Sequence, residues 1–435
     1  MARNRNHVRS KLQCEFLEAR EVPAAFPIAT DAVAISPDDG GIPIVHLASA
    51  KSGTELGQVQ AYEDSFRGGV HAALGDITGD GVPDLVVSPG RGGGPRIRII
   101  DGKSGQTLRD FFVYEPQFTG GIYVALGDVN GDGHDDIICG TGVGGGPRVR
   151  ILDGATLGAD VIRDFFAYEG SFRGGVLVAA GDTNGDGRDD IICGTGVGGG
   201  PRVQVFSGTD GSILRNEFAY EDSFRGGVQV SSGDTNGDGR DDIICGTGPG
   251  GGPVVRVLSG ADGSQLEAFL ADNTSFRGGV RVSSLDVDGN GRDDVIAHLR
   301  HGNDDGFRAL SGEDAHFISG TSRVVDDNPS AHDIQEGGTG SFAPGTISSV
   351  EGTLVSIDST ANTVSIRLQN GSVQVVQAGT GTEVERDKVH VALSTFKAGD
   401  KVEATVGADG IAWEIEAKSP AFVEGSSGRG GSGHG

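Results

Sequence analysis

The sequence predicts an all-β protein: a β-propeller of about six four-stranded blades, followed by a small OB-like β-barrel. Three observations lead to this fold class. The motif FRGGV or FTGGI recurs every 52 to 54 residues, at Phe66, Phe118, Phe172, Phe224 and Phe276. Each unit holds four short runs of alternating or apolar residues, separated by turn residues. Glycine supplies 77 of the 435 residues and falls at fixed places between these runs, which favours tight turns.

Each repeat unit predicts its four strands in a fixed order. An alternating strand such as VLVAAGD leads into an Asp-rich turn, and an apolar strand such as DIICGTG follows. A glycine hinge, GVGGGP, then connects to a third strand such as PRVRILDG and a fourth such as DFFAYE. Four strands repeated around a ring match a propeller blade, because radial closure protects the edges of the sheets.

The number of blades follows from the ends of the repeat. The segment that starts at about Phe26 aligns with the later part of a unit, so it predicts an earlier blade that has lost its Asp-rich turn. The blade that begins at Phe276 degenerates after Arg300. We therefore expect six blades, five of them with the Asp-rich turn, and keep five or seven blades as alternatives.

Outside the repeats the pattern changes. We expect a leader or disordered segment over 1–25, the propeller over 26–320, a polar linker over 321–343, the barrel over 344–419 and a flexible Gly/Ser tail over 420–435. The leader contains Leu17-Glu18-Ala19-Arg20 followed by Val22-Pro23-Ala24, which resembles a short motif at the start of exported bacterial repeat proteins. The barrel has Phe396 and Trp413 nearly alone, so it lacks the aromatic platform that nucleic-acid binding needs.

Charge and composition exclude several partners. The formal net charge of −26 would repel nucleic acid and anionic membrane surfaces. No run of 18 apolar residues exists, so we expect no membrane span. Three of the four cysteines, Cys139, Cys193 and Cys245, occupy one repeat position, which predicts small core residues and not a disulfide framework.

The Asp-rich turns are five nine-residue segments with identical spacing. They begin at Asp76, Asp128, Asp182, Asp234 and Asp286, and we call them Asp loops 1 to 5, with positions 1 to 9. Positions 1, 3, 5 and 9 carry oxygen side chains, and position 7 is expected to offer its backbone carbonyl. Such a set supplies the hard oxygen ligands that Ca²⁺ prefers, whereas Mg²⁺ demands a stricter octahedron. We therefore predict about five structural Ca²⁺ ions.

The predicted ligands take the same five positions in every loop. Loops 1 and 2 contribute Asp76, Thr78, Asp80, Val82 and Asp84, and Asp128, Asn130, Asp132, His134 and Asp136. Loops 3 and 4 contribute Asp182, Asn184, Asp186, Arg188 and Asp190, and Asp234, Asn236, Asp238, Arg240 and Asp242. Loop 5 contributes Asp286, Asp288, Asn290, Arg292 and Asp294.

Position 6 is always glycine, which allows the sharp turn that aims successive oxygens at one centre, with φ expected to be positive. An EF-hand would need a bidentate Glu at position 12, where this chain has Val87, Cys139, Cys193, Cys245 and Ala297. The EF-hand is therefore excluded.

Together, FRGGV, GDxNGDGxxDIICGTG and the following GGP strand resemble the FG-GAP or VCBS repeats of the integrin α-subunit propeller family, over about residues 26 to 320. In that family the loop joins two strands of a blade and binds Ca²⁺. The resemblance implies this role for Asp128, Asn130, Asp132 and Asp136 and for their equivalents. Thr78 and Asn290 depart from the commonest ligand types, which implies weaker first and last sites.

These observations predict a non-enzymatic recognition or adhesion module at the cell surface or outside an exporting bacterium. Its partner would be an unknown protein or carbohydrate. For the Asp loops, the alternative is a solvated turn that binds no ion. A second is a multivalent lectin, in which Arg67, Arg173, Arg225 and Arg277 would line sugar sites with the repeated Tyr-Glu pairs at Tyr62, Tyr114, Tyr168 and Tyr220; blade-to-blade ion pairs are the favoured reading of these residues. A third is a propeller hydrolase or lyase, although no nucleophile or acid pair breaks the repeat.

Overall fold

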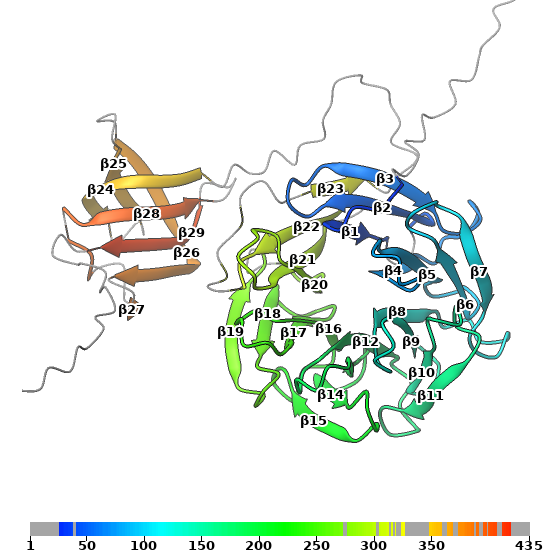
Figure 1. Cartoon of the computed structure of the whole chain (residues 1–435). Coiled ribbons are helices and arrows are strands. Elements are labelled where there is room, and N and C mark those ends of the chain that lie inside the picture. The colour runs from blue at the N-terminus through cyan, green and yellow to red at the C-terminus, as the bar shows by residue number, and fades with distance from the viewer. Residues whose placement is uncertain are drawn as a thin grey trace, which may run out of the picture.

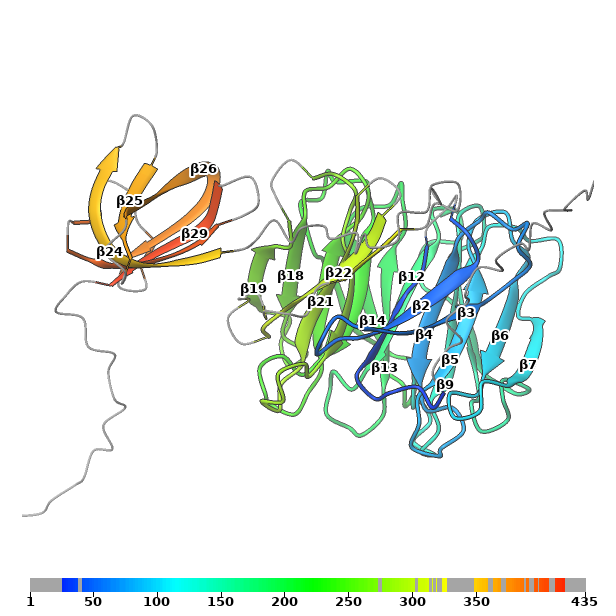
Figure 2. The same cartoon turned by 90° about the horizontal axis from the view of Figure 1, so that it is seen from above.

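A computed structural model describes residues 26–418, except 38–40, 273–275, 302–303, 313–314, 316–317, 319–322, 327–347, 359–362, 369–372, 387–388, 391–394, 398 and 407–410. Within these residues the protein is all-β, and six antiparallel sheets stand around a common axis (Figures 1 and 2). Each sheet is a meander, with its strands in sequence order. The all-β propeller predicted from the repeats is confirmed.

We number the sheets as blades 1 to 6. Blade 1 has β1 (Ala32–Ile35), β2 (Ile44–Ser49) and β3 (Glu55–Gln60). Blade 2 has β4 (Val70–Gly75), β5 (Asp84–Pro89), β6 (Arg96–Ile100) and β7 (Thr107–Phe112). Blade 3 has β8 (Ile122–Gly127), β9 (Asp136–Thr141), β10 (Arg148–Leu152) and β11 (Val161–Phe166).

Blade 4 has β12 (Val176–Gly181), β13 (Asp190–Thr195), β14 (Arg202–Phe206) and β15 (Ile213–Phe218). Blade 5 has β16 (Val228–Gly233), β17 (Asp242–Thr247), β18 (Val254–Leu258) and β19 (Gln265–Leu270). Blade 6 has β20 (Arg281–Leu285), β21 (Asp294–His301), β22 (Asp304–Leu310) and β23 (Arg323–Asp326). The strand β23 lies beyond residue 320, inside the segment that the sequence assigns to a linker.

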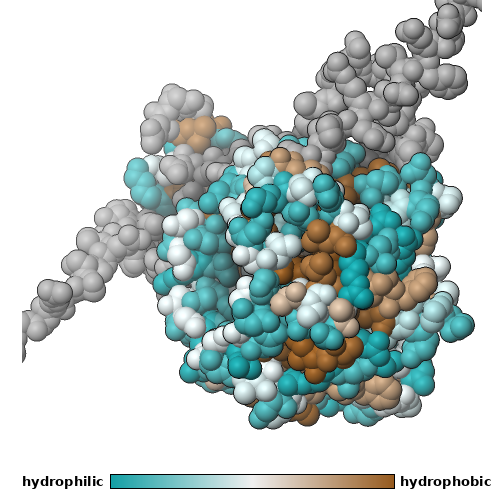
Figure 3. All heavy atoms as spheres, turned by 45° about the vertical axis from the view of Figure 1, so that its right-hand side comes forward, coloured by the Kyte–Doolittle hydropathy of each residue, from teal (hydrophilic) through white to brown (hydrophobic). Residues whose placement is uncertain are grey.

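The burial of each strand follows its place in the blade. In blades 2 to 5 the second strand is buried at every residue, because a neighbouring blade covers each of its faces. The fourth strand lies outermost (Figure 1), and in blades 2 to 5 exposed residues recur along it. Cys139, Cys193 and Cys245 are fully buried free thiols in second strands, as predicted, and Cys14 lies outside the described residues. From one side the surface is mostly hydrophilic, with apolar residues gathered towards the middle (Figure 3).

Blades 1 and 6 close the ring. Val33 and Ile35 of β1 share a hydrophobic cluster with Ile296 of β21 and Phe307 of β22. Arg281 Nη2 of blade 6 also donates to the carbonyl of Ser36 at 2.8 Å. The described part of the chain therefore forms six blades, and the alternatives of five or seven fall away.

The C-terminal strands form a separate sheet. It consists of β24 (Ser348–Asp358), β25 (Thr363–Arg367), β26 (Val373–Arg386), β27 (Val389–His390), β28 (Lys401–Val406) and β29 (Ile411–Lys418). The order β25-β24-β28-β29-β26, with a further β26–β25 pairing, closes a ring of five strands in which β26 and β29 are parallel. Leu354, Val364, Ile366 and Ile415 lie in its core. The OB-like identity of this ring stays a prediction.

Candidate metal centres

The five Asp loops connect the first strand of blades 2 to 6 to the second strand. Position 1 follows the first strand directly, and position 9 is the first residue of the second strand. Because the five first strands run in the same direction along the propeller axis, all the loops lie at the same end of the propeller.

The carboxylate at position 1 holds the loop around itself. In loop 3, Asp182 Oδ1 accepts hydrogen bonds from the amides of Gly185 (2.7 Å) and Asp186 (3.0 Å), and Oδ2 accepts from Gly187 (2.8 Å). The same set recurs in loops 2, 4 and 5. The glycine at position 6 has φ between 82° and 88° in all five loops, which confirms the expected positive value. Position 4, which the sequence reasoning did not single out, is also glycine with positive φ.

The carboxylate at position 9 lies beneath the loop and is fully buried in all five cases. Asp136 shows its contacts: Oδ2 accepts from the amides of Val129 (3.1 Å) and Asn130 (3.2 Å), and Oδ1 accepts from Gly154 (2.9 Å) in the turn between β10 and β11. Burial raises the pKa of Asp136 to about 6. Because no ion pair of Asp136 occurs among the described residues, a bound cation would stabilise its charged form.

Two of the five residues at position 3 support the same conclusion. Asn130 Oδ1 and Thr78 Oγ1 are buried, yet neither has a hydrogen-bond partner, whereas Asn236 Oδ1 and Asp288 Oδ1 accept from the position-5 amides of their loops. A buried oxygen without a partner is costly, so each needs a ligand that the protein itself does not supply. In loop 5, carboxylate oxygens of Asp286, Asp288 and Asp294 all lie within 4.8 Å of one another, close enough to share one ion.

Positions 5 and 7 have different roles. The position-5 side chains, Asp80, Asp132, Asp186, Asp238 and Asn290, are exposed, and each accepts a hydrogen bond from the position-7 amide. In loop 1, Lys103 Nζ also contacts Asp80 at 2.9 Å, which places a competing cation at this site. The position-7 side chain of His134 points away from its own loop, because Nδ1 lies 2.9 Å from the carbonyl of Ile77 in the preceding blade. Only the backbone of position 7 is therefore a candidate ligand.

Position 8 links successive loops, a role that sequence reasoning missed. Asp135, Asp189 and Asp241 each accept a hydrogen bond from the position-1 amide of the preceding loop, at 2.7, 2.9 and 3.1 Å. Their own amides, and that of Asp293, donate back to the position-1 carbonyl. Burial, together with neighbouring carboxylates, raises the pKa of Asp189 to about 7. We call these contacts the loop-to-loop links.

The ends of this series confirm the role of position 8. The residue before each loop is glycine in loops 1 to 4, where the next blade's position-8 aspartate approaches: a Cβ on Gly181 would lie 2.3 Å from Asp241 Oδ2. Loop 5 has Leu285 there, because the next blade, blade 1, has no Asp loop. Loop 1 has Pro83 at position 8, because blade 1 also precedes it. Leu285 and Pro83 are therefore the two residues in the sequence from which the linking role of position 8 could have been predicted.

The repeated tyrosines are structural. Tyr62, Tyr114, Tyr168 and Tyr220 are at most 7% exposed, and each hydroxyl donates to a second-strand carbonyl of the following blade. The glutamates that follow them pair with Arg96, Arg148 and Arg202 of that blade. The blade-to-blade ion pairs therefore exist. The prediction that they use the arginines of FRGGV is wrong, because Arg67, Arg173 and Arg225 donate to carbonyls of their own turns.

Comparison with known proteins identifies the repeat. The family model for FG-GAP-like repeats matches residues 182–245, which span loops 3 and 4. Integrin alpha pat-2 of Caenorhabditis briggsae is 29% identical over 212 residues, a match that covers 40% of this chain and 17% of the relative.

Two solved propellers are similar at low TM-scores. TolB from Acinetobacter baumannii has a TM-score of 0.43 and 14% identity, with 70% of this chain and 68% of TolB covered. The Dos1 propeller has a TM-score of 0.39 and 12% identity, with 77% and 73% covered. Among the described residues, no helix has the length and apolar character that crossing a membrane requires.

The ring of six sheets with a repeated Asp loop defines a β-propeller of the kind built from FG-GAP-like units. The family model matches FG-GAP-like repeats at residues 182–245, and the similarity to an integrin α subunit over 40% of the chain supports the same kind of repeat.

Proposed function

We propose that the five Asp loops bind Ca²⁺ and that the ions stabilise a non-enzymatic recognition module. The observation that carries this proposal is the buried, unpartnered Asn130 Oδ1 beside the carboxylates of Asp128 and Asp136 in one loop. All candidate ligand atoms are oxygens, which suits a hard cation and not zinc. The side-chain oxygens at positions 1, 3, 5 and 9 and the backbone carbonyls at position 7 would hold each ion.

A structural role for the ions fits better than a catalytic one. Near-identical sites recur in five blades, and each loop supplies enough oxygens to fill a coordination shell, so no site is singled out for chemistry. Each ion would neutralise clustered carboxylates, and it would stabilise the folded state by mass action. Its affinity is expected in the range of extracellular modules, with a dissociation constant on the order of 10⁻⁴ to 10⁻³ M.

The place of action that we propose is outside the cell or at its surface. The support is the similarity of 40% of the chain to a protein named as an integrin α subunit. An unknown protein partner is the favoured ligand class, because a structural propeller with many exposed loops offers a large contact surface. Immunolabelling of intact cells of the source organism tests the location: labelling only after permeabilisation would contradict it.

Counting bound ions tests the metal assignment directly. Equilibrium dialysis of the full chain against Ca²⁺ should give about five bound ions per chain. The number should be lower if Lys103, which contacts Asp80, prevents Ca²⁺ from binding to loop 1. Parallel dialysis against Mg²⁺ serves as the control and should show weaker binding. Binding of no Ca²⁺ at millimolar concentration would refute the proposal and leave the loops as hydrogen-bonded turns.

A multivalent lectin remains the second candidate, on a different observation from the tyrosines. Phe112, Phe166 and Phe218 are 54%, 58% and 55% exposed, and each lies opposite an arginine of the third strand, namely Arg96, Arg148 or Arg202. A sugar can stack on such an exposed ring and accept hydrogen bonds from the neighbouring guanidinium group. A glycan array with the wild type and with Phe166→Ala tests this candidate, and the lack of any bound glycan would remove it.

A further inference from the structure

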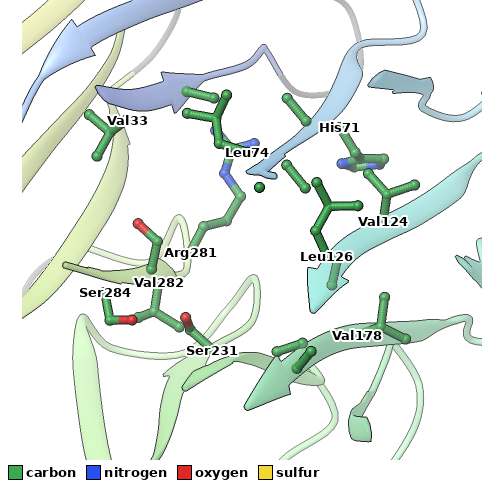
Figure 4. Close-up of a pocket in the computed structure, with 18 of the residues that line it drawn as sticks. Val33, His71, Leu74, Val124, Leu126, Val178, Ser231, Arg281, Val282 and Ser284 are labelled. Carbon is green, nitrogen blue, oxygen red and sulfur yellow. The ribbon is translucent and has the colours of Figure 1, made fainter. Parts of the chain in front are cut away.

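We propose that an extended segment of a partner polypeptide binds on the propeller axis and completes blade 1 as its innermost strand. A cavity of about 450 Å³ lies there, lined mainly by β1 and by the first strands of the other five blades (Figure 4). The site uses none of the candidate Ca²⁺ ligands, so it stands independently of the metal proposal.

Blade 1 lacks the innermost strand among the described residues, because β1 corresponds to the second strand of the other blades. Tyr62 comes after β3 as Tyr114 comes after β7, and the β2–β3 pair has the same bulge as the β6–β7 pair. The described lining of the cavity includes β1 but no residue of β5, β9, β13 or β17, which lie behind the first strands of their own blades. Five first strands therefore surround a space in which six would stand in a regular ring.

The exposure of the two first strands beside blade 1 shows that this space is open. Every residue of β20 and all residues of β4 except Val70 are half-buried. In β12, across the ring from blade 1, every residue except Ala180 is buried. The strands beside blade 1 therefore lack the neighbour that a sixth first strand would supply.

The inner edge of β1 directs backbone groups into the cavity. The carbonyl of Asp31 accepts from the Ala50 amide at 2.8 Å, and in an antiparallel ladder every second residue pairs with the same neighbouring strand, here β2. The residues between, Ala32, Ala34 and Ser36, turn their N–H and C=O groups to the opposite edge, and all three line the cavity. In the described chain β1 pairs with β2 alone, so this edge is open to a further strand.

Two of these six backbone groups already have a partner. The Ala32 amide donates to the Ala29 carbonyl at 3.0 Å, and the Ser36 carbonyl accepts from Arg281 Nη2 at 2.8 Å. The Arg281 side chain extends into the cavity (Figure 4) and supplies the hydrogen bond that an amide of a neighbouring strand would give. No described residue pairs with the N–H or the C=O of Ala34, in the middle of the edge. An added strand would bond both groups of Ala34 and displace Arg281 from Ser36.

The chain itself enters blade 1 from outside the cavity. Phe26, the first described residue, packs against the turn between β6 and β7, where a Cβ on Gly105 would lie 2.5 Å from the Phe26 ring. In blade 2, by contrast, the residues directly before the Asp loop, Leu74 and Gly75, line the cavity, whereas Phe26 does not. The residues directly before β1 therefore do not lead out of the cavity, and we assign the missing strand to another polypeptide.

The equivalence of Pro37 and Thr247 fixes the register of the added strand. The carbonyl of each accepts from the valine that ends FRGGV in the next blade, at 2.9 and 2.8 Å. The residues one and three places before Thr247 pair with the second and fourth residues of β16, counted from the valine that ends FRGGV. The second and fourth residues of an added strand would therefore face Ser36 and Ala34.

The five existing first strands define which segment fits. In the same count, their first residue is Val or Ile, their third is Ala or Val and their fourth is Ala or Ser, whereas the second is different in each unit. The first residue is at most 1% exposed in all five strands. When a strand is added to a sheet edge, main-chain hydrogen bonds supply affinity and alternate side chains supply specificity. The partner is therefore a polypeptide that presents an extended segment with this order of residues.

A peptide with the sequence of residues 228–234, capped at both ends, is the probe, titrated into the full chain in Ca²⁺-containing buffer and followed by ligand-observed NMR. It should bind with a dissociation constant on the order of 1 mM. Two N-methylated forms of the peptide are the matched pair. Methylation at the fourth residue removes the N–H that faces Ala34, and it should weaken binding at least about tenfold. Methylation at the third residue alters the opposite edge, and it should leave the affinity nearly unchanged.

Ala34→Pro tests the same edge from the side of the protein. Proline removes the Ala34 amide, which makes no bond to β2, so the variant should keep the sheet and bind the unmodified peptide at least about tenfold more weakly. Should Ala34→Pro fail to fold, the two N-methylated peptides with the wild type still decide. Equal binding of the two methylated peptides, or no saturable binding of the unmodified one, would overturn the proposal. So would a dimer of the full chain that the peptide dissociates, because a second copy would then supply the strand.

Discussion

Replacement of Asp238 by Asn tests ion binding in a single Asp loop separately from the folding of that loop. Asp238 occupies position 5 of loop 4, and Oδ1 accepts from the Arg240 amide at 3.0 Å. Asparagine preserves this hydrogen bond, because Asn290 in loop 5 accepts from the Arg292 amide in the same way, at 2.8 Å. The substitution therefore removes one negative charge from the proposed ion site and leaves the loop geometry intact.

The magnitude follows from mass action. At about 2 mM free Ca²⁺, a dissociation constant on the order of 10⁻⁴ to 10⁻³ M stabilises the folded chain by about 0.7 to 1.8 kcal/mol per loop. Five loops together would contribute about 3 to 9 kcal/mol. Asp238→Asn should lose up to one loop's share. With chelator present the same change should be neutral or slightly stabilising, since it relieves repulsion with Asp234 and Asp242.

Urea unfolding measures both quantities. Wild type and Asp238→Asn are each unfolded in about 2 mM Ca²⁺ and in EDTA. The difference in free energy of unfolding between wild type and variant is then compared between these two conditions. The expected result is a deficit of the variant that appears only with Ca²⁺. A deficit of the same size in EDTA would show that Asp238 serves the turn and not an ion. Absence of any Ca²⁺ effect on the wild type would refute the metal assignment as a whole.

Three further predictions concern the contacts between blades. Gly181→Ala should lower the free energy of unfolding by about 2 kcal/mol or more, because a Cβ there would lie 2.3 Å from Asp241 Oδ2, whereas Gly170→Ala, with its nearest atom at 3.7 Å, should be nearly neutral in the same urea assay. Tyr168→Phe should cost about 1 to 2 kcal/mol in urea unfolding, since the hydroxyl donates to the buried Cys193 carbonyl at 2.6 Å; an unchanged midpoint would contradict this role. Burial alone would raise the pKa of Asp164, but hydrogen bonds from Arg148 and Arg150 outweigh it and hold the pKa below its usual value. Because the folded pKa lies below the unfolded one, this stabilisation is present above about pH 4 and is lost as the pH falls further, so acid titration of Asp164→Asn should show a shallower loss of stability than the wild type.

Local patterns made most of the fold predictable. Alternation and turn residues located the four strands of each unit, and the glycine at position 6 predicted the positive φ that Gly187 shows. The number of blades was uncertain because closure depends on contacts between distant segments: Val33 and Phe307 share a cluster only once the ring has formed. The strand Arg323–Asp326 was missed because its four residues carry no repeat motif.

In the candidate site, too, contacts between residues close in sequence could be predicted and contacts between distant residues could not. Residues within a loop, such as Asp182 and Gly187, could be assigned from their spacing, since they contact one another. The role of Asp189 could not, because its partner, the amide of Asp128, lies 61 residues away in the preceding loop. The arginines of FRGGV were misassigned for a related reason: sequence proximity to Tyr-Glu suggested a contact, whereas the glutamates reach Arg96 or its equivalents about 33 residues further on.

The loop-to-loop links also determine how occupancy of one Asp loop is felt by another. Each link joins position 8 of one loop to position 1 of the loop before it, and Pro83 and Leu285 interrupt the series on both sides of blade 1. Although the blades form a circle, the five loops form an open line with two ends. If the loops bind Ca²⁺ as proposed, each of loops 2 to 4 has two linked neighbours through which the occupancy of another loop can act, whereas loops 1 and 5 have one each.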